Sequence, residues 1–379
     1  DGDVARHSPG LFHSSQEGEP SISVLTCGHP PAVSGDSFSF DPVGSFEFPD
    51  DPAIKLHYPP LLEMLKHCYK QGFSHIHAST PGPMGLAALL ISRILDVPLT
   101  ASYDAAFAHV AADLTGDFGM EELAWKYLSW FYAQMKTITV PSRAAMEELA
   151  SRGISRERIH VQLVPVDTRM FNPHKRNGFW KTRYGLDDAS LNLLHVGRLS
   201  LADNLDVLVD AFARVARARK DVHLIIVGEG PYLNTMRKKL KGLPCLFAGR
   251  LGREDLAMAY ACSDLFITPS TTDVFGEQIL EAQSSGLPAI VSDQGGAREN
   301  LIARETGLVF PANDAKALFS AIMYSLDNPG LLTAMRRKAR ENSQRRSMLP
   351  DPALNTLSSL DFCRNEHKDR SRNQETVML

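Results

Sequence analysis

The sequence predicts an α/β protein made of two doubly wound lobes that face a cleft. Short apolar runs alternate with helical stretches from about residue 190, as expected for a parallel sheet built from βαβ units. The first half shows the same alternation less completely, and a polar segment containing Pro and Gly at 172–188 separates the halves. The 379 residues, of which 44% are hydrophobic, suffice for two buried cores.

The first lobe is predicted to span residues 1–175. Its expected strands alternate with expected helices at 59–70, 84–95 and 121–132. His75 and His77 share one side of a strand, which favours a packing role over metal ligation. The strands of this lobe are expected at 22–26, 75–77, 99–102, 137–140 and 159–164.

The second lobe is predicted to span residues 190–345. After its first strand, Leu205, Leu208, Phe212 and Val215 fall on one face of a helix. A last helix at 315–326 follows Asp314, a suitable N-cap. Residues 346–379 form a tail, predicted to be disordered over the polar stretch 364–376. The strands are expected at 193–196, 223–227, 246–247, 265–268, 289–291 and 308–309.

Composition excludes several classes of protein. A net charge of −4 argues against a nucleic-acid partner, and the five scattered cysteines indicate a reducing compartment. Histidines and cysteines show no metal-ligand spacing, so no metal site is expected. No apolar run reaches the roughly 18 residues of a membrane span, and residues 1–20 show no signal peptide. We therefore expect a cytoplasmic protein, and the opening residue Asp1 favours a processed chain or a fragment.

Two carboxylates carry the main functional signal. Asp273 and Glu281 lie eight positions apart in T-T-D-V-F-G-E-Q-I-L-E-A, residues 271–282. The spacing places one acid in a loop and the other about a turn into a helix. Both could face one ligand at the helix N-terminus, where backbone N–H groups favour phosphate. Such a pair alone is common by chance.

Three further motifs also follow predicted strands of the second lobe. In H-V-G-R-L-S, Gly197 permits a tight turn and Arg198 can bind a diphosphate with two N–H groups. V-G-E-G-P at 227–231 and S-D-Q-G-G at 292–296 are turns that each have a purely structural interpretation. Because parallel strands end at one edge of a sheet, the combination predicts one site.

Together with P-S…D-x-F-G…L-E-A…S-G-L-P and E-T-G-L-V, these motifs resemble the retaining, nucleotide-sugar-dependent glycosyltransferases of group 1. That family has the GT-B fold of two Rossmann-like lobes. The most similar subgroup contains mannosyltransferase-like and sulfoquinovosyltransferase-like enzymes. H-A-S-T-P-G-P-M-G-L-A-A-L at 77–89 and V-P-S-R at 140–143 agree, so the resemblance covers about residues 22–330.

The resemblance implies a hexosyltransferase and assigns roles to residues. Glu281 would accept hydrogen bonds from the donor ribose, and Asp273 would contact the donor sugar. The backbone N–H groups of Phe275 and Gly276 would meet the diphosphate, and Arg198 would neutralise its charge. The donor would be a UDP- or GDP-linked sugar. The acceptor would be a lipid or a glycan. No cofactor is implied.

The chain departs from the family pattern at several positions. Asp203 stands where the family has a lysine, and a carboxylate there would repel the diphosphate. Asp104 replaces a histidine that contacts the transferred sugar; it could act as a general base. Pro165 replaces a glycine of the R-G-[VI]-D turn. Nothing at 1–20 matches the family's first strand and Gly-rich loop.

These departures leave alternatives open. The chain is either an active transferase or a weak or inactive GT-B scaffold that binds a nucleotide or a partner. A sugar-nucleotide epimerase has similar lobes, whereas a phosphorylase would need a lysine for pyridoxal phosphate, for which no motif is found. The basic run 336–340 is interpreted as a solvated helix face, with peripheral contact to an anionic membrane as the second option.

Overall fold

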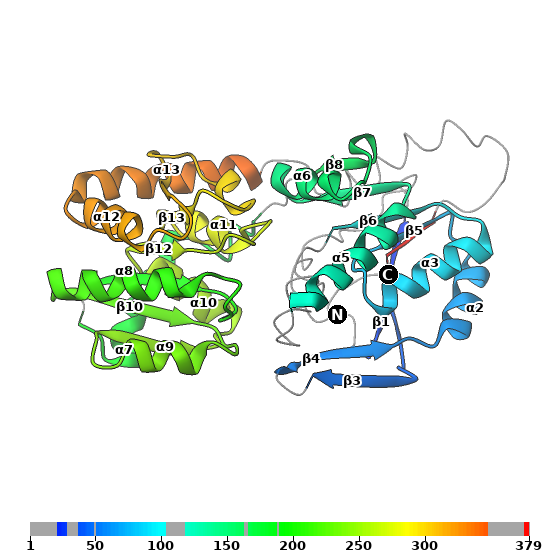
Figure 1. Ribbon diagram of the computed structural model, residues 1–379, viewed down its shortest axis with the longest axis horizontal. Helices are drawn as coiled ribbons and strands as arrows, with labels where there is room; N and C mark the ends of the chain where they lie inside the picture. Colours follow the sequence, from blue (N-terminus) through cyan, green and yellow to red (C-terminus); the bar gives the residue numbers. More distant parts are fainter. Residues whose placement is uncertain are drawn as a thin grey trace. The chain divides into compact units, whose positions relative to one another are not determined.

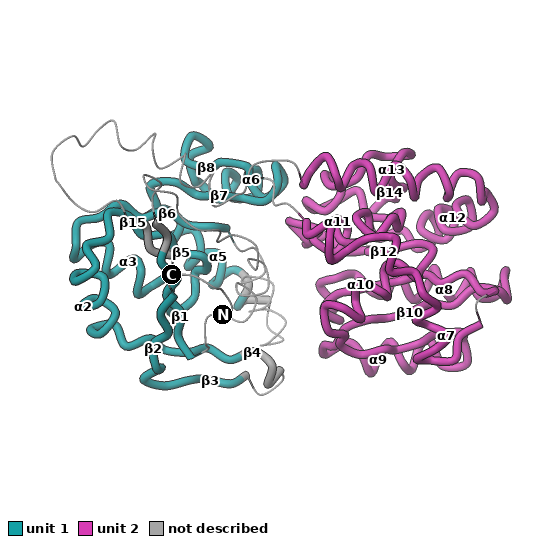
Figure 2. The backbone as a smooth tube through the Cα atoms, turned by 180° about the vertical axis from the view of Figure 1, so that it is seen from behind, with its two compact units in different colours: residues 1–162, 350–379 teal, residues 163–349 magenta. Residues whose placement is uncertain are grey.

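The chain folds into two compact units, shown in separate colours in Figure 2. The computed structural model describes residues 21–28, 37–48, 51–103, 118–162, 166–187, 189–347 and 375–378. Unit 1 comprises residues 1–162 and 350–379, and unit 2 comprises 163–349. The division precedes the expected linker, because Phe171, Phe179 and Trp180 are buried in the core of unit 2.

Unit 2 contains a parallel sheet in the order β11-β10-β9-β12-β13-β14. The chain first builds outward from β9 to β11 and then returns to the other side of β9 with β12. This order places a topological switch point between β9 and β12, where ligands bind in doubly wound sheets. Its strands are β9 (Leu191–Val196), β10 (Val222–Val227), β11 (Cys245–Gly249), β12 (Leu265–Thr268), β13 (Ala289–Ser292) and β14 (Gly307–Phe310).

Helices cover both faces of this sheet (Figure 1). Alternate strand residues point to opposite faces, so Leu193 joins one core and Leu194 the other. The first core packs α8 (Leu205–Ala218), α9 (Leu233–Lys239), α12 (Ala315–Leu326) and part of α13 (Pro329–Ser347). The second packs α7 (Phe179–Tyr184), α10 (Arg253–Ala261) and α11 (Glu277–Ser284). Two short 3₁₀ turns, η2 (Pro173–Lys175) and η3 (Ala297–Asn300), complete the unit.

Unit 1 contains a second parallel sheet, in the order β2-β1-β15-β5-β6-β7-β8. The sheet strands are β1 (Ser21–Cys27), β2 (Ser37–Phe40), β5 (His75–Ala78), β6 (Leu99–Ser102), β7 (Thr137–Val140), β8 (Ile159–Val161) and β15 (Glu375–Met378). Beside it lie a hairpin of β3 (Gly44–Phe48) and β4 (Asp51–Tyr58), and the helices α2 (Leu61–Gln71), α3 (Pro83–Leu95), α5 (Phe118–Ala133), α6 (Arg143–Ser151) and the turn η1 (Arg156–Arg158).

The C-terminal strand β15 lies between β1 and β5 and pairs with both in parallel. Its first two residues, Glu375 and Thr376, fall in the stretch expected to be disordered, so that expectation is wrong for them. Four residues are too few to show a period, and the paired residues lie about 300 residues (β5) and about 350 residues (β1) earlier in the chain. The strand therefore could not be predicted from local pattern.

Candidate functional site

Three loops meet at the carboxyl end of the unit 2 sheet, beside the switch point. We name them by the strands they follow: the β9 loop (197–204), the β12 loop (269–276) and the β13 loop (293–300). Ser270 Oγ donates to Asp203 Oδ1 at 3.3 Å, which joins the first two loops. Gly296 N donates to Asp273 O at 2.9 Å, which joins the last two.

The V-G-E-G-P turn supports the β9 loop by close backbone packing. Gly197 N donates to Val227 O at 3.1 Å, and Leu199 N donates to Glu229 O at 2.9 Å. A Cβ on Gly228 would stand 1.9 Å from the carbonyl oxygen of Gly197. The turn therefore has a structural role here: it holds Gly197 and Arg198 at the end of β9.

Asp203 is held by hydroxyl groups. Its carboxylate accepts hydrogen bonds from Ser200 Oγ at 2.9 Å and from Ser270 Oγ at 3.3 Å. The next residue, Asn204, has a left-handed φ of 57° and begins α8. The structure thus places a carboxylate, bound to two loops, where the resemblance has a lysine.

Asp273 caps its own loop. Its Oδ1 accepts hydrogen bonds from Phe275 N at 2.9 Å and Gly276 N at 2.7 Å. Burial raises the pKa of Asp273, these two N–H groups lower it, and the charge of Glu277 raises it. The two N–H groups expected to meet a diphosphate therefore donate to a carboxylate of the chain itself.

The β13 loop fixes the backbone of this turn. Gly276 has φ of 67°, and a Cβ there would lie 2.9 Å from both Ala297 Cα and Asn300 Nδ2. The Asn300 amide donates to Gly276 O at 3.2 Å and also to Phe275 O. Only glycine fits this position without displacing its neighbours.

Glu281 lies in the second turn of α11 and is 8% exposed. Tyr260, in the core of unit 2, has a pKa raised well above its usual value, first by burial and then by the Glu281 carboxylate. The two acids of the motif thus have different neighbours, since Asp273 binds its own loop and Glu281 lies beside Tyr260. The ribose and sugar roles assigned to them remain predictions.

His195 is a residue at this site that the sequence analysis missed. It is 2% exposed, and its Nδ1 lies 2.9 Å from Ile267 O on β12. Burial lowers its pKa to about 4, although the bond to Ile267 acts in the opposite direction. Its position directly before Val196 and Gly197, in H-V-G-R-L-S, could have indicated from the sequence that His195 belongs to this site.

Two other expectations concern residues away from these loops. Asp104 and Pro165 lie outside the described residues. The expectation that 336–340 is a solvated basic face is wrong for two of its arginines. Arg336 Nη2 donates to Asp264 Oδ1 at 2.7 Å, and Arg340 Nη1 donates to Ser284 O at 2.6 Å. Both arginines fix α13 to the body of unit 2.

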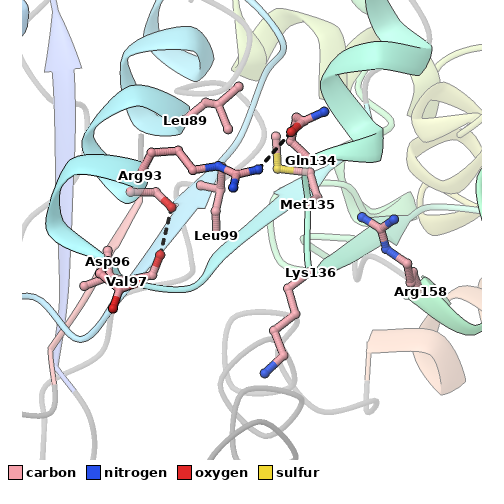
Figure 3. Close-up of a pocket in the computed structure, with 10 residues that line it drawn as sticks. Leu89, Arg93, Asp96, Val97, Leu99, Gln134, Met135, Lys136 and Arg158 are labelled. Carbon is pink, nitrogen blue, oxygen red and sulfur yellow. Dashed lines mark hydrogen bonds between the residues drawn. The ribbon is translucent and has the colours of Figure 1, made fainter. Parts of the chain in front are cut away.

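A hollow of about 520 Å³ occurs in unit 1, at the amino ends of β6 and β7 (Figure 3). Ligands of doubly wound folds bind at the carboxyl ends of the strands, so this hollow lies at the opposite edge of its sheet. Arg93, Lys136 and Arg158 line it, and Arg93 Nη2 donates to Gln134 Oε1 at 2.8 Å. The predicted site residues do not line this hollow.

The described residues form neither a cluster of metal ligands nor a membrane-spanning helix. No three His, Cys, Asp or Glu side chains gather there as a metal site, and the expected absence of a metal remains a prediction. Among the helices described, none has the length and apolar character needed to span a bilayer.

Family comparisons cover most of the chain. Residues 178–346 match the family of glycosyl transferases group 1, and residues 19–169 match glycosyltransferase family 4. Arabidopsis thaliana sulfoquinovosyl transferase SQD2 is 28% identical over 71% of this chain and 53% of its own length. A GDP-mannose-dependent alpha-mannosyltransferase of Mycobacterium tuberculosis is 30% identical over 63% of this chain and 60% of its own length. The chain thus spans little more than half the length of these relatives.

Solved structures confirm the predicted fold class. Anabaena Alr3699/HepE, in complex with UDP and glucose, superposes with a TM-score of 0.68 at 16% identity, covering 92% of this chain and all of that one. Sucrose-phosphate synthase from Thermosynechococcus elongatus gives 0.67 at 18% identity, covering 92% and 99%. At this identity the likeness shows the fold alone, which is GT-B with two Rossmann-like domains.

Proposed function

We propose that this chain, which belongs to the group 1 glycosyltransferases, transfers a hexose from a nucleoside diphosphate sugar to an acceptor hydroxyl, with retention of configuration. The meeting of the β9, β12 and β13 loops at the switch point carries the proposal. A UDP- or GDP-linked donor is supported by relatives described as GDP-mannose-dependent and by fold neighbours solved with UDP-glucose. A lipid or glycan acceptor stays a proposal.

The chemistry would be mainly electrostatic. Departure of the nucleoside diphosphate leaves negative charge on its terminal phosphate, and Arg198 would stabilise that charge from the β9 loop. Gly197 would let the backbone approach the phosphates. Both backbone hydrogen bonds of Asp273 use Oδ1. In this proposal its Oδ2 accepts from a hydroxyl of the transferred sugar, while Glu281 accepts from the ribose.

Binding of the donor is the first test. A ligand present at 100 times its Kd adds about 2.7 kcal/mol to the stability of the folded state. We expect one of the UDP-, GDP- or ADP-sugars to raise the melting temperature of the protein. Arg198→Ala should lower the affinity for that sugar nucleotide tenfold or more. Arg217→Ala is the matched control, because Arg217 is exposed in the last turn of α8, at the other edge of the sheet. No shift with any sugar nucleotide would contradict the proposal.

A second candidate is an inactive scaffold that binds a nucleotide without turnover. Two observations favour it: Asp203 places a carboxylate where the family has a cation, and Asp273 already accepts the N–H groups of Phe275 and Gly276. A radiolabelled donor distinguishes the candidates. Transfer or sugar release that is lost in Asp273→Asn excludes the scaffold, whereas binding with no turnover across a panel of acceptors supports it.

A further inference from the structure

His195 lies at the end of the ladder between β9 and β12, the two strands that form the switch point. The ladder between β9 and β12 pairs Leu265 with Leu193 and Phe266 with Leu194. One residue further on, the contact between the strands is made by a side chain, since the His195 ring reaches Ile267 O. The ring therefore stands where the paired part of β9 and β12 ends, at the switch point beside which doubly wound folds bind ligands.

The hydrogen bond fixes the tautomer of this ring. A carbonyl oxygen can only accept, so Nδ1 must carry the proton that points at Ile267 O. Because the lowered pKa of about 4 keeps the imidazole neutral at pH 7, Nε2 bears no proton. His195 thus presents an acceptor, and only an acceptor, at Nε2.

This acceptor is directed toward the β9 loop. Nε2 is the heavy atom nearest to the place where a Cβ on Gly197 would stand, at 3.8 Å. It is buried, and within the described residues it makes no hydrogen bond. A buried acceptor without a donor has lost its hydrogen bonds to water and has gained none in return. A ligand group that donates a hydrogen bond to it would therefore increase the affinity of that ligand.

We propose that His195 Nε2 accepts a hydrogen bond from a hydroxyl group of the bound sugar nucleotide. This inference rests on the proposed function. Phosphate oxygens are excluded as partners because they are acceptors at neutral pH. The β9 loop also carries Gly197 and Arg198, which we assign to the diphosphate. The groups adjacent to a diphosphate are the ribose and the hexose, both rich in hydroxyls, whereas the base lies beyond the ribose.

Two substitutions separate the roles of the ring nitrogens. In His195→Asn the amide nitrogen can take the place of Nδ1 and keep the bond to Ile267, while the acceptor at Nε2 is lost. His195→Gln places its amide near Nε2 and loses the bond to β12. We expect Asn to retain the melting temperature but to bind UDP-glucose or GDP-mannose about tenfold more weakly, the effect of one hydrogen bond of about 1.4 kcal/mol. Gln should melt at a lower temperature and lose less affinity.

Calorimetry with altered ligands identifies the hydroxyl. If it belongs to the hexose, wild type and His195→Asn will bind plain UDP or GDP equally. If it belongs to the ribose, the difference will persist with UDP and disappear with a deoxyribose analogue. Equal affinities of the folded Asn variant and the wild type for every ligand would overturn the inference, while binding by the wild type would leave the proposed function intact. Absence of donor binding to wild type would remove both.

A measurement on the wild-type protein covers the case in which His195→Asn does not fold. In protein with ¹⁵N-labelled histidine, the Nε2 resonance of His195 should show an unprotonated nitrogen that shifts when saturating UDP-glucose or GDP-mannose is added. The exposed His174 in the same unit is the internal control. A bound donor that leaves the Nε2 resonance unchanged would also overturn the inference.

Discussion

Acidification should destabilise unit 1 through two buried histidines. On β5, His75 Nε2 lies 3.1 Å and His77 Nδ1 2.9 Å from Thr100 Oγ1, and His77 Nε2 lies 2.9 Å from Ser102 Oγ. Burial lowers the pKa of His75 to about 3, aided by the charges of His77 and Lys136, and that of His77 to about 4. Both rings are therefore neutral in the folded chain at pH 5.

Proton linkage gives the sign and the size of this change in the free energy of unfolding. In the unfolded chain each histidine has a pKa near 6.5, so below that pH the unfolded state binds more protons and stability falls. Because pH 5 lies about 1.5 units below the unfolded pKa, protonation stabilises the unfolded state by about 2 kcal/mol per histidine. Unit 1 should thus lose about 4 kcal/mol between pH 7.5 and 5, and further loss should continue toward the folded pKa values. Carboxylates contribute little above pH 5.

Urea unfolding at several pH values measures this loss. Trp180 is the tryptophan of unit 2, so fluorescence of a Trp180→Phe variant reports unit 1 through Trp125 and Trp130. We expect His77→Gln to halve the loss on acidification, and the matched control is His160→Gln, which alters an exposed histidine of the same unit. A free energy of unfolding that stays constant from pH 7.5 to 5 would refute the reasoning.

Three further predictions concern the loops and the C-terminal strand. Asp203→Lys should cost about 1–2 kcal/mol of stability, because two hydrogen bonds are lost, yet tighten binding of a nucleoside diphosphate; calorimetry and melting check both. Gly228→Ala should strongly destabilise unit 2, since its Cβ would stand 1.9 Å from Gly197 O, whereas Gly242→Ala, with nothing within 4 Å of its Cβ, should melt closer to wild type. Deletion of 375–379 should lower the unfolding transition of unit 1 and spare that of unit 2, because β15 pairs with β1 and β5; coincident loss of both transitions would contradict this.

The sequence predicted the regular elements well where the signal is local. The bounds of β6, β7, β12 and α12 agree with expectation, and Asp314 caps α12 by accepting from Lys316 N at 2.9 Å. The hairpin of β3 and β4 was missed, although Phe46 and Phe48 in β3 and Ile54, Leu56 and Tyr58 in β4 alternate with polar residues. Two arginines of 336–340 were misassigned because their partners, such as Asp264, lie far away in the sequence.

The candidate site was predicted in its position more than in its contacts. Motif order placed the loops at one sheet edge, and the strand order confirms that they leave the strands around the switch point. The contacts depend on the direction of each side chain, which spacing does not give. The capping of Phe275 and Gly276 by Asp273 was not predicted, since those N–H groups were assigned to the diphosphate, although a carboxylate two and three residues before backbone N–H groups forms a common turn.

The two aspartates at the switch point, Asp203 and Asp273, both accept hydrogen bonds from the chain itself. Asp203 accepts from two serine hydroxyls and Asp273 Oδ1 accepts from two backbone N–H groups, although burial still raises the pKa of Asp273. In the proposed function, a diphosphate would enter a site in which the N–H groups of Phe275 and Gly276 already donate to Asp273. Donor binding must then either displace Oδ1 of Asp273 or place the phosphates nearer to Arg198. Asp273→Asn decides between these, because an amide is easier to displace than a carboxylate: tighter binding of the nucleoside diphosphate indicates displacement, and unchanged affinity indicates that the phosphates lie at the β9 loop.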